Sequence, residues 1–323
     1  MRYKIGIPLV VMLLVAGVIG FDTNSAAQNQ DEEGTRGGFI TSRPATVSGS
    51  VGGSVGGSVG IGSGGGSAPR RKPRRRPATA KSTQPKSNTG KGTGATVTAN
   101  SNTGAGAGVK TYNAPALGMG YTLYMRNENG EAVRVDPSRN FRTGERVRLL
   151  LETNTDGYLY IFNTTDNGDP VMIYPDTRLD DGGNYIEAHV PIEIPSREEQ
   201  DENFRWFTFD NKPGTERLYV VFSREPLSGV PIEDDLVKYC GQSGQNCPWR
   251  PPTALWAQVR AGMNARVQVA RSKTYGQAQT SGEVDAVNRG IGLTRSAPEP
   301  SVIRINASST SGLLVTVLEL AHS

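Results

Sequence analysis

The sequence predicts an all-β fold: an antiparallel, immunoglobulin-like β-sandwich behind a long N-terminal region without packed structure. Glycine, with 40 residues in 323, is concentrated in the first third, whereas nearly all aromatic residues follow Tyr112. Beyond Tyr112, short apolar runs alternate with turn-forming dipeptides at even spacing, a pattern typical of sandwiches and barrels. The roughly 200 residues after the glycine-rich region suffice for one substantial core.

The first 27 residues have the order of a secretory signal. Arg2 and Lys4 form a positive end, residues 5–21 are apolar without charge, and small residues precede a cleavage site after Ala27. An uncleaved membrane anchor is the alternative, because the apolar run is only slightly shorter than a membrane span. Either reading predicts an exported protein, periplasmic or extracellular. No cysteine lies near the signal, which excludes a lipoprotein anchor.

Residues 28–114 are expected to form a disordered linker. A short repeat of Gly, Ser and Val at 48–60 buries almost nothing and has high backbone entropy. Between Pro69 and Pro77 lies a basic run, which consists of Arg70, Arg71, Lys72, Arg74, Arg75 and Arg76. This run is either a solvated spacer or a contact for anionic envelope polymers or lipid head groups. Nucleic acid is disfavoured, because the protein is exported and no aromatic residue interleaves the charges.

The β-rich domain is expected at 115–323. Strands are predicted at 121–125, 132–135, 146–151, 158–162, 171–174, 185–190, 192–194, 206–209, 218–223 and 313–320. Asn129-Gly130 and Asp156-Gly157 supply turns between them. The run 158–162 is apolar on both faces, which indicates a central strand. Residues 228–300 read as an insertion that is mostly loop.

One short helix is expected within the insertion. Thr253 follows two prolines and can cap a helix that carries Leu255, Trp256 and Val259 on one side. Nearby, Cys240 and Cys247 are the two cysteines of the chain, and an oxidising compartment would join them in a disulfide. Free thiols and a metal site are the alternatives. A metal site needs more ligands than the two histidines of the chain supply.

Several motifs in the β-rich domain follow a recognisable order. They are Asn140-Phe141-Arg142-Thr143-Gly144-Glu145, Asp156 through Asn163, Gly168, Ile173-Tyr174-Pro175, Ile194-Pro195, and Phe207 through Lys212-Pro213-Gly214-Thr215-Glu216. Together, residues 117–227 resemble the bacterial family known as domain of unknown function 4384. The resemblance implies a β-rich, non-catalytic accessory domain, found in exported proteins and beside kinase-like or caspase-like domains. It carries no catalytic residues over to this chain.

No catalytic residue, cofactor or metal site is predicted. His189 has no accompanying Ser or Cys nucleophile motif and reads as structural, and His322 is expected to be mobile at the C-terminus. The acidic residues in turns are explained by turn chemistry rather than by calcium. Most large aromatic side chains should be core, and any that face outward would form a binding face. The candidates are Tyr158, Tyr160, Phe162, Tyr174 and Trp206.

These observations favour an exported cell-envelope protein that binds or scaffolds through its β-sandwich. Its expected partners are an envelope protein or polysaccharide, with anionic polymers or lipid head groups at the basic linker. A glycan-binding module is the alternative and would need an exposed, coplanar aromatic pair. An unrecognised hydrolase is the third reading and would need a pocket holding His189 near a carboxylate and a hydroxyl.

Overall fold

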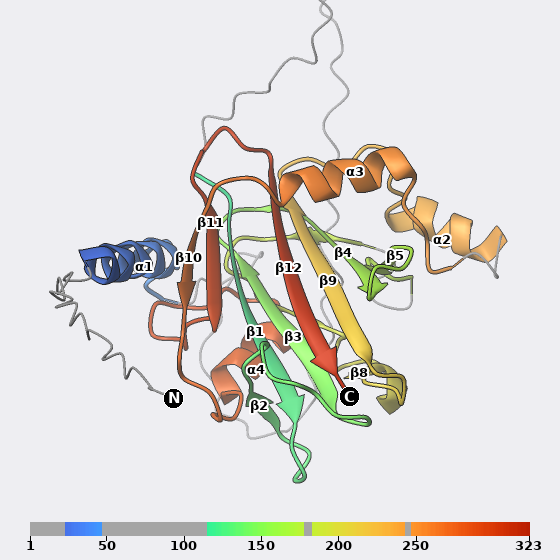
Figure 1. Cartoon of the computed structure of the whole chain (residues 1–323), viewed down its shortest axis with the longest axis horizontal. Coiled ribbons are helices and arrows are strands. Elements are labelled where there is room, and N and C mark those ends of the chain that lie inside the picture. Colours follow the sequence, from blue (N-terminus) through green and yellow to red (C-terminus); the bar gives the residue numbers. More distant parts are fainter. Residues whose placement is uncertain (1–22, 47–114, 178–182, 243–246) are drawn as a thin grey trace, which may run out of the picture.

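The computed structural model describes residues 23–46, 115–177, 183–242 and 247–323. Their strands form two antiparallel sheets that face each other across a shared core (Figure 1). The prediction of a mainly β fold built from antiparallel sheets is therefore confirmed. Residues 1–22 of the signal expected at 1–27, and the basic linker residues 70–76, lie outside the described residues.

The first sheet has seven strands. Its order is β10 (Val267–Arg271), β11 (Val302–Asn306), β1 (Gly118–Arg126), β3 (Arg146–Thr153) and β7 (Ile192–Ile194), with β2 (Ala132–Arg134) paired to β1 and β8 (Phe207–Thr208) paired to β3. The long β1–β3 pair runs in register from Met119 opposite Thr153 to Met125 opposite Val147. Because β7 and β8 both pair with β3 alone, they form one edge of this sheet.

The second sheet has five strands. Its order is β12 (Leu313–His322), β9 (Gly214–Ser223), β4 (Gly157–Thr165) and β5 (Val171–Tyr174), with β6 (Tyr185–Ile186) paired to β4. The β9–β12 pair extends over ten residue pairs. The run 158–162 is central, as predicted, because β4 has β9 on one side and β5 and β6 on the other. The short β5 therefore lies at the edge of this sheet.

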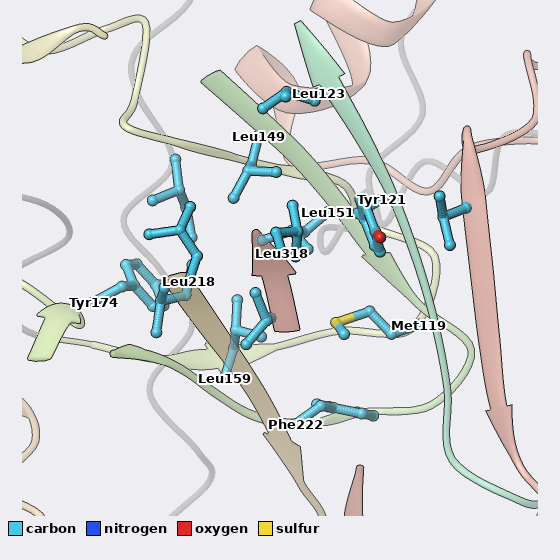
Figure 2. Packing of buried hydrophobic residues seen from close by; sticks show 14 of the residues in the cluster. Met119, Tyr121, Leu123, Leu149, Leu151, Leu159, Tyr174, Leu218, Phe222 and Leu318 are labelled. Atoms are coloured by element: carbon cyan, nitrogen blue, oxygen red, sulfur yellow. The ribbon is translucent and has the colours of Figure 1, made fainter. Parts of the chain in front are cut away.

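The core lies between the sheets and follows the alternation of the strands. Met119, Tyr121 and Leu123 project from β1 toward Leu218 and Phe222 of β9, as Figure 2 shows. All five side chains are buried. Burying each large apolar side chain contributes roughly 1.5–3 kcal/mol, so this layer is the main source of stability.

Helices cover the outer faces of both sheets. They are α1 (Thr23–Thr41), α2 (Glu233–Gln242), α3 (Thr253–Gly262) and α4 (Ser281–Arg289), and a 3-10 turn, η2, spans Glu202–Phe204. Helix α3 lies over β12 and β9, and α2 lies on the side of β5, whereas α1 lies against β10 (Figure 1). Helix α4 contacts β1 and β2 through Glu283. Each sheet therefore has at least one helix packed on its outer face.

The expected linker boundary is wrong at its start. Helix α1 and the following turn pack on the first sheet, where Phe39 is fully buried against Ala270 and Ile303. The side chain of Arg43 is buried as well and bonds Glu152 of β3. The segment lacks sustained apolar periodicity, and Gly34, Gly37 and Gly38 disfavour a helix. Tertiary packing overrides that propensity.

The insertion at 228–300 is also more ordered than predicted. It contains α2, α3, β10 and α4 rather than one helix in a loop, and β11 follows it. Helix α3 begins at Thr253 and buries Leu255 and Val259, but the capping position is Pro252, which makes no side-chain cap. The C-terminus differs too: β12 continues to His322, which is only 5% exposed because it pairs with Gly214 of β9.

Among the described residues, no helix combines the length and the apolar character that spanning a bilayer requires.

Candidate binding cleft

The predicted aromatic binding face is wrong, because its members are buried. Tyr158, Tyr160 and Phe162 do project from β4 away from the inter-sheet core, but a second apolar layer from the insertion covers them. The hydroxyl of Tyr160 accepts a hydrogen bond from the backbone N–H of Leu227 at 2.9 Å. The ring of Phe162 meets Trp256 of α3 edge to face. These rings hold the insertion on the sheet and offer no exposed platform.

Tyr174 and Trp206 are buried in different places. Tyr174 belongs to the core between the sheets. The ring of Trp206 stacks beneath the guanidinium of Arg148, 4.0 Å from it, and is 8% exposed. Burial lowers the pKa of Arg148 to about 10, although the carboxylate of Glu193 opposes this shift. The guanidinium of Arg148 therefore covers one face of the Trp206 indole and is not exposed to solvent.

A cavity opens where the β5 edge of the second sheet approaches the β7 and β8 edge of the first. It has a volume of about 480 Å³, which is within the range of small-molecule sites. Its lining comes from β5 and the turn after it, from β7 and β8, and from η2. Helix α2 and residues 247–249 complete the lining. The lining residues are Met172, Ile173, Pro175, Asp176, Thr177, Ile194, Pro195, Glu199, Phe204, Trp206, Phe207, Leu236, Cys240, Cys247, Pro248 and Trp249. We call this cavity the edge cleft.

Local sequence explains why the cleft forms at this edge. Pro175 and Pro195 end β5 and β7, because proline lacks the N–H that would continue a ladder. The backbone N–H of Met172 is nevertheless satisfied by the carbonyl of Trp249, which closes the edge of β5. The two sheets therefore do not pair with each other at this edge, and the cleft lies between them.

A disulfide forms one wall of the edge cleft. Cys240, near the end of α2, is bonded to Cys247, with 5.5 Å between their Cα atoms. Both cysteines line the cleft together with Leu236 and Trp249. The bond therefore fixes α2 to the segment that caps β5.

The chemistry of the cleft is apolar and aromatic with an acidic component. Phe204 is 47% exposed and is one of the most exposed large apolar side chains among the described residues. Asp176 and Glu199 are the charged groups of the lining, and no lysine, arginine or histidine is among them. The arrangement suits a ligand with apolar surface and positive charge.

A smaller compartment of about 270 Å³ adjoins the edge cleft, with Ile173 and Phe207 lining both. Its polar wall includes Glu216, whose carboxylate accepts hydrogen bonds from Asn163 at 2.9 Å and from Thr165 at 3.0 Å. Nδ1 of His322 and Oδ1 of Asn163 are buried without a hydrogen-bond partner in the described structure. Two polar atoms of this compartment are therefore available to hydrogen-bond a ligand.

His189 lies in a buried ion cluster away from both cavities. Its Nδ1 is 2.7 Å from Oε1 of Glu152. The carboxylate of Glu152 also accepts two hydrogen bonds from Arg43, one on each oxygen. The predicted strand 185–190 ends early, at Ile186, and His189 adopts a positive φ of 59°. The ring packs against Phe39, and His189 lines neither the edge cleft nor the smaller compartment.

Two further buried ion pairs lie on the outer face of the first sheet. Arg134 bonds Glu283 at 2.8 Å, and Tyr124 donates to the same carboxylate at 2.9 Å. Burial raises the pKa of Tyr124 well above its ordinary value, and the charge of Glu283 raises it further. The other pair joins Arg148 to Glu193 at 3.2 Å. Sequence reasoning missed these pairs because each joins residues far apart in the chain.

Metal ligands do not gather in the described part of the chain. No group of three or more His, Cys, Asp or Glu residues is placed to hold an ion. Of the acidic turn residues, Asp166 accepts a hydrogen bond from the backbone N–H of Thr215, so its carboxylate joins the turn after β4 to the neighbouring strand β9.

Fold and cleft together define a two-sheet β-rich domain with a cavity at one edge of its sheets. Residues 140–226 match the model of the family described as "Domain of unknown function (DUF4384)", which confirms the resemblance. The matched segment runs from the turn before β3 to just beyond β9, and it includes Pro175, Pro195 and Phe207 of the cleft lining. No curated protein matches the chain. No solved structure matches it either.

Proposed function

We propose that this chain is an exported cell-envelope protein whose β-rich domain binds or scaffolds a partner without catalysis, on a flexible basic tether. The edge cleft is the observation that carries the proposal. It is a preformed cavity of about 480 Å³ with an exposed aromatic side chain, Phe204, at its lining. Aromatic anchors in such pockets commonly dominate binding energy.

We propose in addition that the two sheets form an immunoglobulin-like sandwich. The order β12-β9-β4-β5 facing β1-β3-β7 supports this, because variable-type domains place their strands in two such sheets. In that arrangement the additional strands β10 and β11 extend the first sheet beyond β1. The edge cleft then lies on the opposite side, where no strand among the described residues extends either sheet beyond β5 or β7.

The two alternative functions lack the features that would favour them. A glycan-binding module needs an exposed aromatic pair, and the candidate rings Tyr158 and Tyr160 are at most 5% exposed. A hydrolase needs a pocket at His189, whose side chain is buried beside Glu152 and lines none of the described cavities. The binding role therefore has the stronger support.

Capture from envelope extract tests the binding role. We expect the full chain to enrich a protein or polysaccharide, and Phe204→Ser to reduce retention about fivefold or more, as for an aromatic hot spot. Val237→Ser is the matched control, because Val237 is an apolar side chain of similar exposure, 44%, outside the lining. Enrichment of nothing, or equal effects of both variants, would refute the proposal. The full chain is required because Phe39 and Arg43 pack on the domain.

Mass spectrometry of the mature chain tests export. We expect an N-terminus at Gln28 if the signal is cut after Ala27. Helix α1 begins at Thr23 and so spans this site. An intact Met1 would refute cleavage, and recovery of the chain in the cytoplasmic fraction would refute export.

A further inference from the structure

We propose that the edge cleft and the smaller compartment beside it accept an extended, cationic, proline-containing segment, and that the resident occupant is residues 69–77 of this same chain. The inference rests on the binding role proposed above and assigns the occupant. A partner that presents the same chemistry would then compete with the linker for the cleft.

Charge complementarity is the first argument. Asp176 and Glu199 line the edge cleft, and Asp210 and Glu216 line the smaller compartment. No lysine or arginine is among the described residues that line either cavity, although the chain carries a net charge of +4. Residues 198–202 add an acidic rim beside η2 and contribute exposed carboxylates. Of these, Glu202 bonds Arg126 at 3.2 Å, so the rim is not wholly available.

The apolar lining is the second argument. Phe204, Trp206, Phe207 and Trp249 bring four aromatic rings to one cavity. Aromatic-lined grooves with acidic neighbours bind proline-containing segments, which are extended before binding and lose little entropy. The basic run has prolines at positions 69, 73 and 77, each separated by three cationic residues. The segment therefore offers proline rings and positive charges to a cleft whose lining includes aromatic rings and carboxylates.

The unused polar atoms are the third argument. Oδ1 of Asn163 is a buried acceptor without a partner, beside the carboxylate of Glu216. Nδ1 of His322, in a residue only 5% exposed, also lacks a partner. A buried polar group without a partner is destabilising, and a guanidinium or ammonium donor to Asn163 would remove that cost. The smaller compartment therefore fits the tip of one cationic side chain.

The chain is long enough to place the segment in the cleft. Residues 47–68 connect it to the end of the α1 region, and residues 78–114 connect it to β1. The first connection is Gly- and Ser-rich and the second is rich in Thr, Asn, Gly and Ala. Chains of these lengths with the dimensions of a Gly/Ser coil span roughly 26 Å and 33 Å on average. A domain of this size has a radius of gyration of roughly 17 Å. Both connections reach the cleft, at an effective concentration on the order of millimolar.

Hydrogen exchange of the full chain tests the occupant. One variant replaces the basic run with glutamine, as Arg70→Gln, Arg71→Gln, Lys72→Gln, Arg74→Gln, Arg75→Gln and Arg76→Gln. We expect backbone amides at 171–177 and 194–207 to exchange about fivefold faster or more than in the wild type. A synthetic peptide of residues 69–77 should restore their protection. The control is Lys81→Gln, Lys86→Gln and Lys91→Gln, which should leave exchange unchanged.

Three outcomes would overturn the assignment of residues 69–77 as the occupant of the cleft. They are equal exchange in the wild type and the six-fold variant, an equal effect of the control, and a peptide that restores nothing. If Phe204-dependent capture from extract persists in any of these cases, the proposed binding role stands and only the linker is excluded. If the exchange result holds but no partner is captured, the linker occupies the cleft and the proposed function fails.

Discussion

The guanidinium of Arg43 is buried and meets both a carboxylate and the backbone of a distant loop. Its Nε and Nη2 donate to Glu152 at 2.9 and 2.6 Å, and its remaining donors reach the carbonyls of Thr294, Ala297 and Pro298. Since Glu152 also contacts His189, removal of the arginine leaves a buried carboxylate with one neighbour. Loss of one member of a buried pair is far more costly than loss of a surface pair.

Arg43→Ala is therefore expected to lower the free energy of unfolding by about 3–5 kcal/mol. Arg36→Ala is the control from the same segment, because Arg36 and its partner Glu299 are 27% and 42% exposed. Its expected effect is about 0–1 kcal/mol. Urea denaturation of both variants measures the difference. Equal effects would show that the Arg43–Glu152 pair does not hold the segment in place.

Gly157 has a packing role that its position in a turn motif conceals. The sequence suggested an Asp-Gly turn, but Gly157 is the first residue of β4. A Cβ there would lie 2.6 Å from the carbonyl oxygen of Ser223 and 2.5 Å from the ring of Phe222. Both atoms belong to β9, whose backbone cannot retreat without disturbing the sheet.

Gly157→Ala is expected to destabilise the protein by about 1–3 kcal/mol, the usual cost of overpacking. Gly37→Ala is the matched control, since a Cβ at Gly37 of α1 meets nothing within 4 Å. That control should stabilise by about 0.5–1 kcal/mol, because alanine favours a helix interior. Thermal or urea unfolding gives the sign of each change. A stabilising Gly157→Ala would contradict the close approach of β4 and β9.

At the scale of elements, period-two alternation located the long strands well. The runs 146–151 and 218–223 lie within β3 and β9, and 313–320 lies within β12. Alternation is decisive there because each strand has one face on the core. Helix α1 could not be predicted in this way, since its sequence is glycine-rich and only the distant packing of Phe39 selects it.

One missed element did carry a local signal. Thr280 and Glu283 form a capping box at the start of α4, and Gly290 ends the helix with a positive φ of 58°. The pattern Thr-x-x-Glu followed by a glycine seven residues later is readable in the sequence. Glu283 then has a second role that sequence cannot reveal, as the buried partner of Arg134.

The disulfide acts on α2 and on the wall of the edge cleft. Replacing both Cys240 and Cys247 with serine is expected to destabilise by about 2–3 kcal/mol, from the entropy of the opened loop. Because α2 is attached at that point, its amides should also exchange faster than those of α3. Urea unfolding and hydrogen exchange measure the two effects. Unfolding of the wild type under reducing conditions should match the variant, and an unchanged midpoint would argue against a structural role of the bond.

At the scale of the whole molecule, the division into a glycine-rich front and a β-rich body was predictable from composition. The edge cleft was not, because its walls come from β5, β7, η2 and the disulfide, which are brought together only by folding. The motif residues Pro175 and Pro195 were identified individually. Their shared position at two adjacent sheet edges depends on the pairing of β4 with β5 and of β3 with β7.

The assignment of residues 31–46 to the domain makes a prediction about the whole chain. A fragment that begins at Tyr112 loses Phe39 and Arg43, so it should be less stable than the full chain by at least the effect of Arg43→Ala. Deleting residues 51–60 only shortens the connection between residues 46 and 115. Loop-closure entropy then changes stability by about 0.1 kcal/mol, which is too small to measure. Urea unfolding of both proteins separates a structural N-terminal segment from a passive one. If the fragment is as stable as the full chain, α1 contributes nothing to the fold and the domain begins at β1.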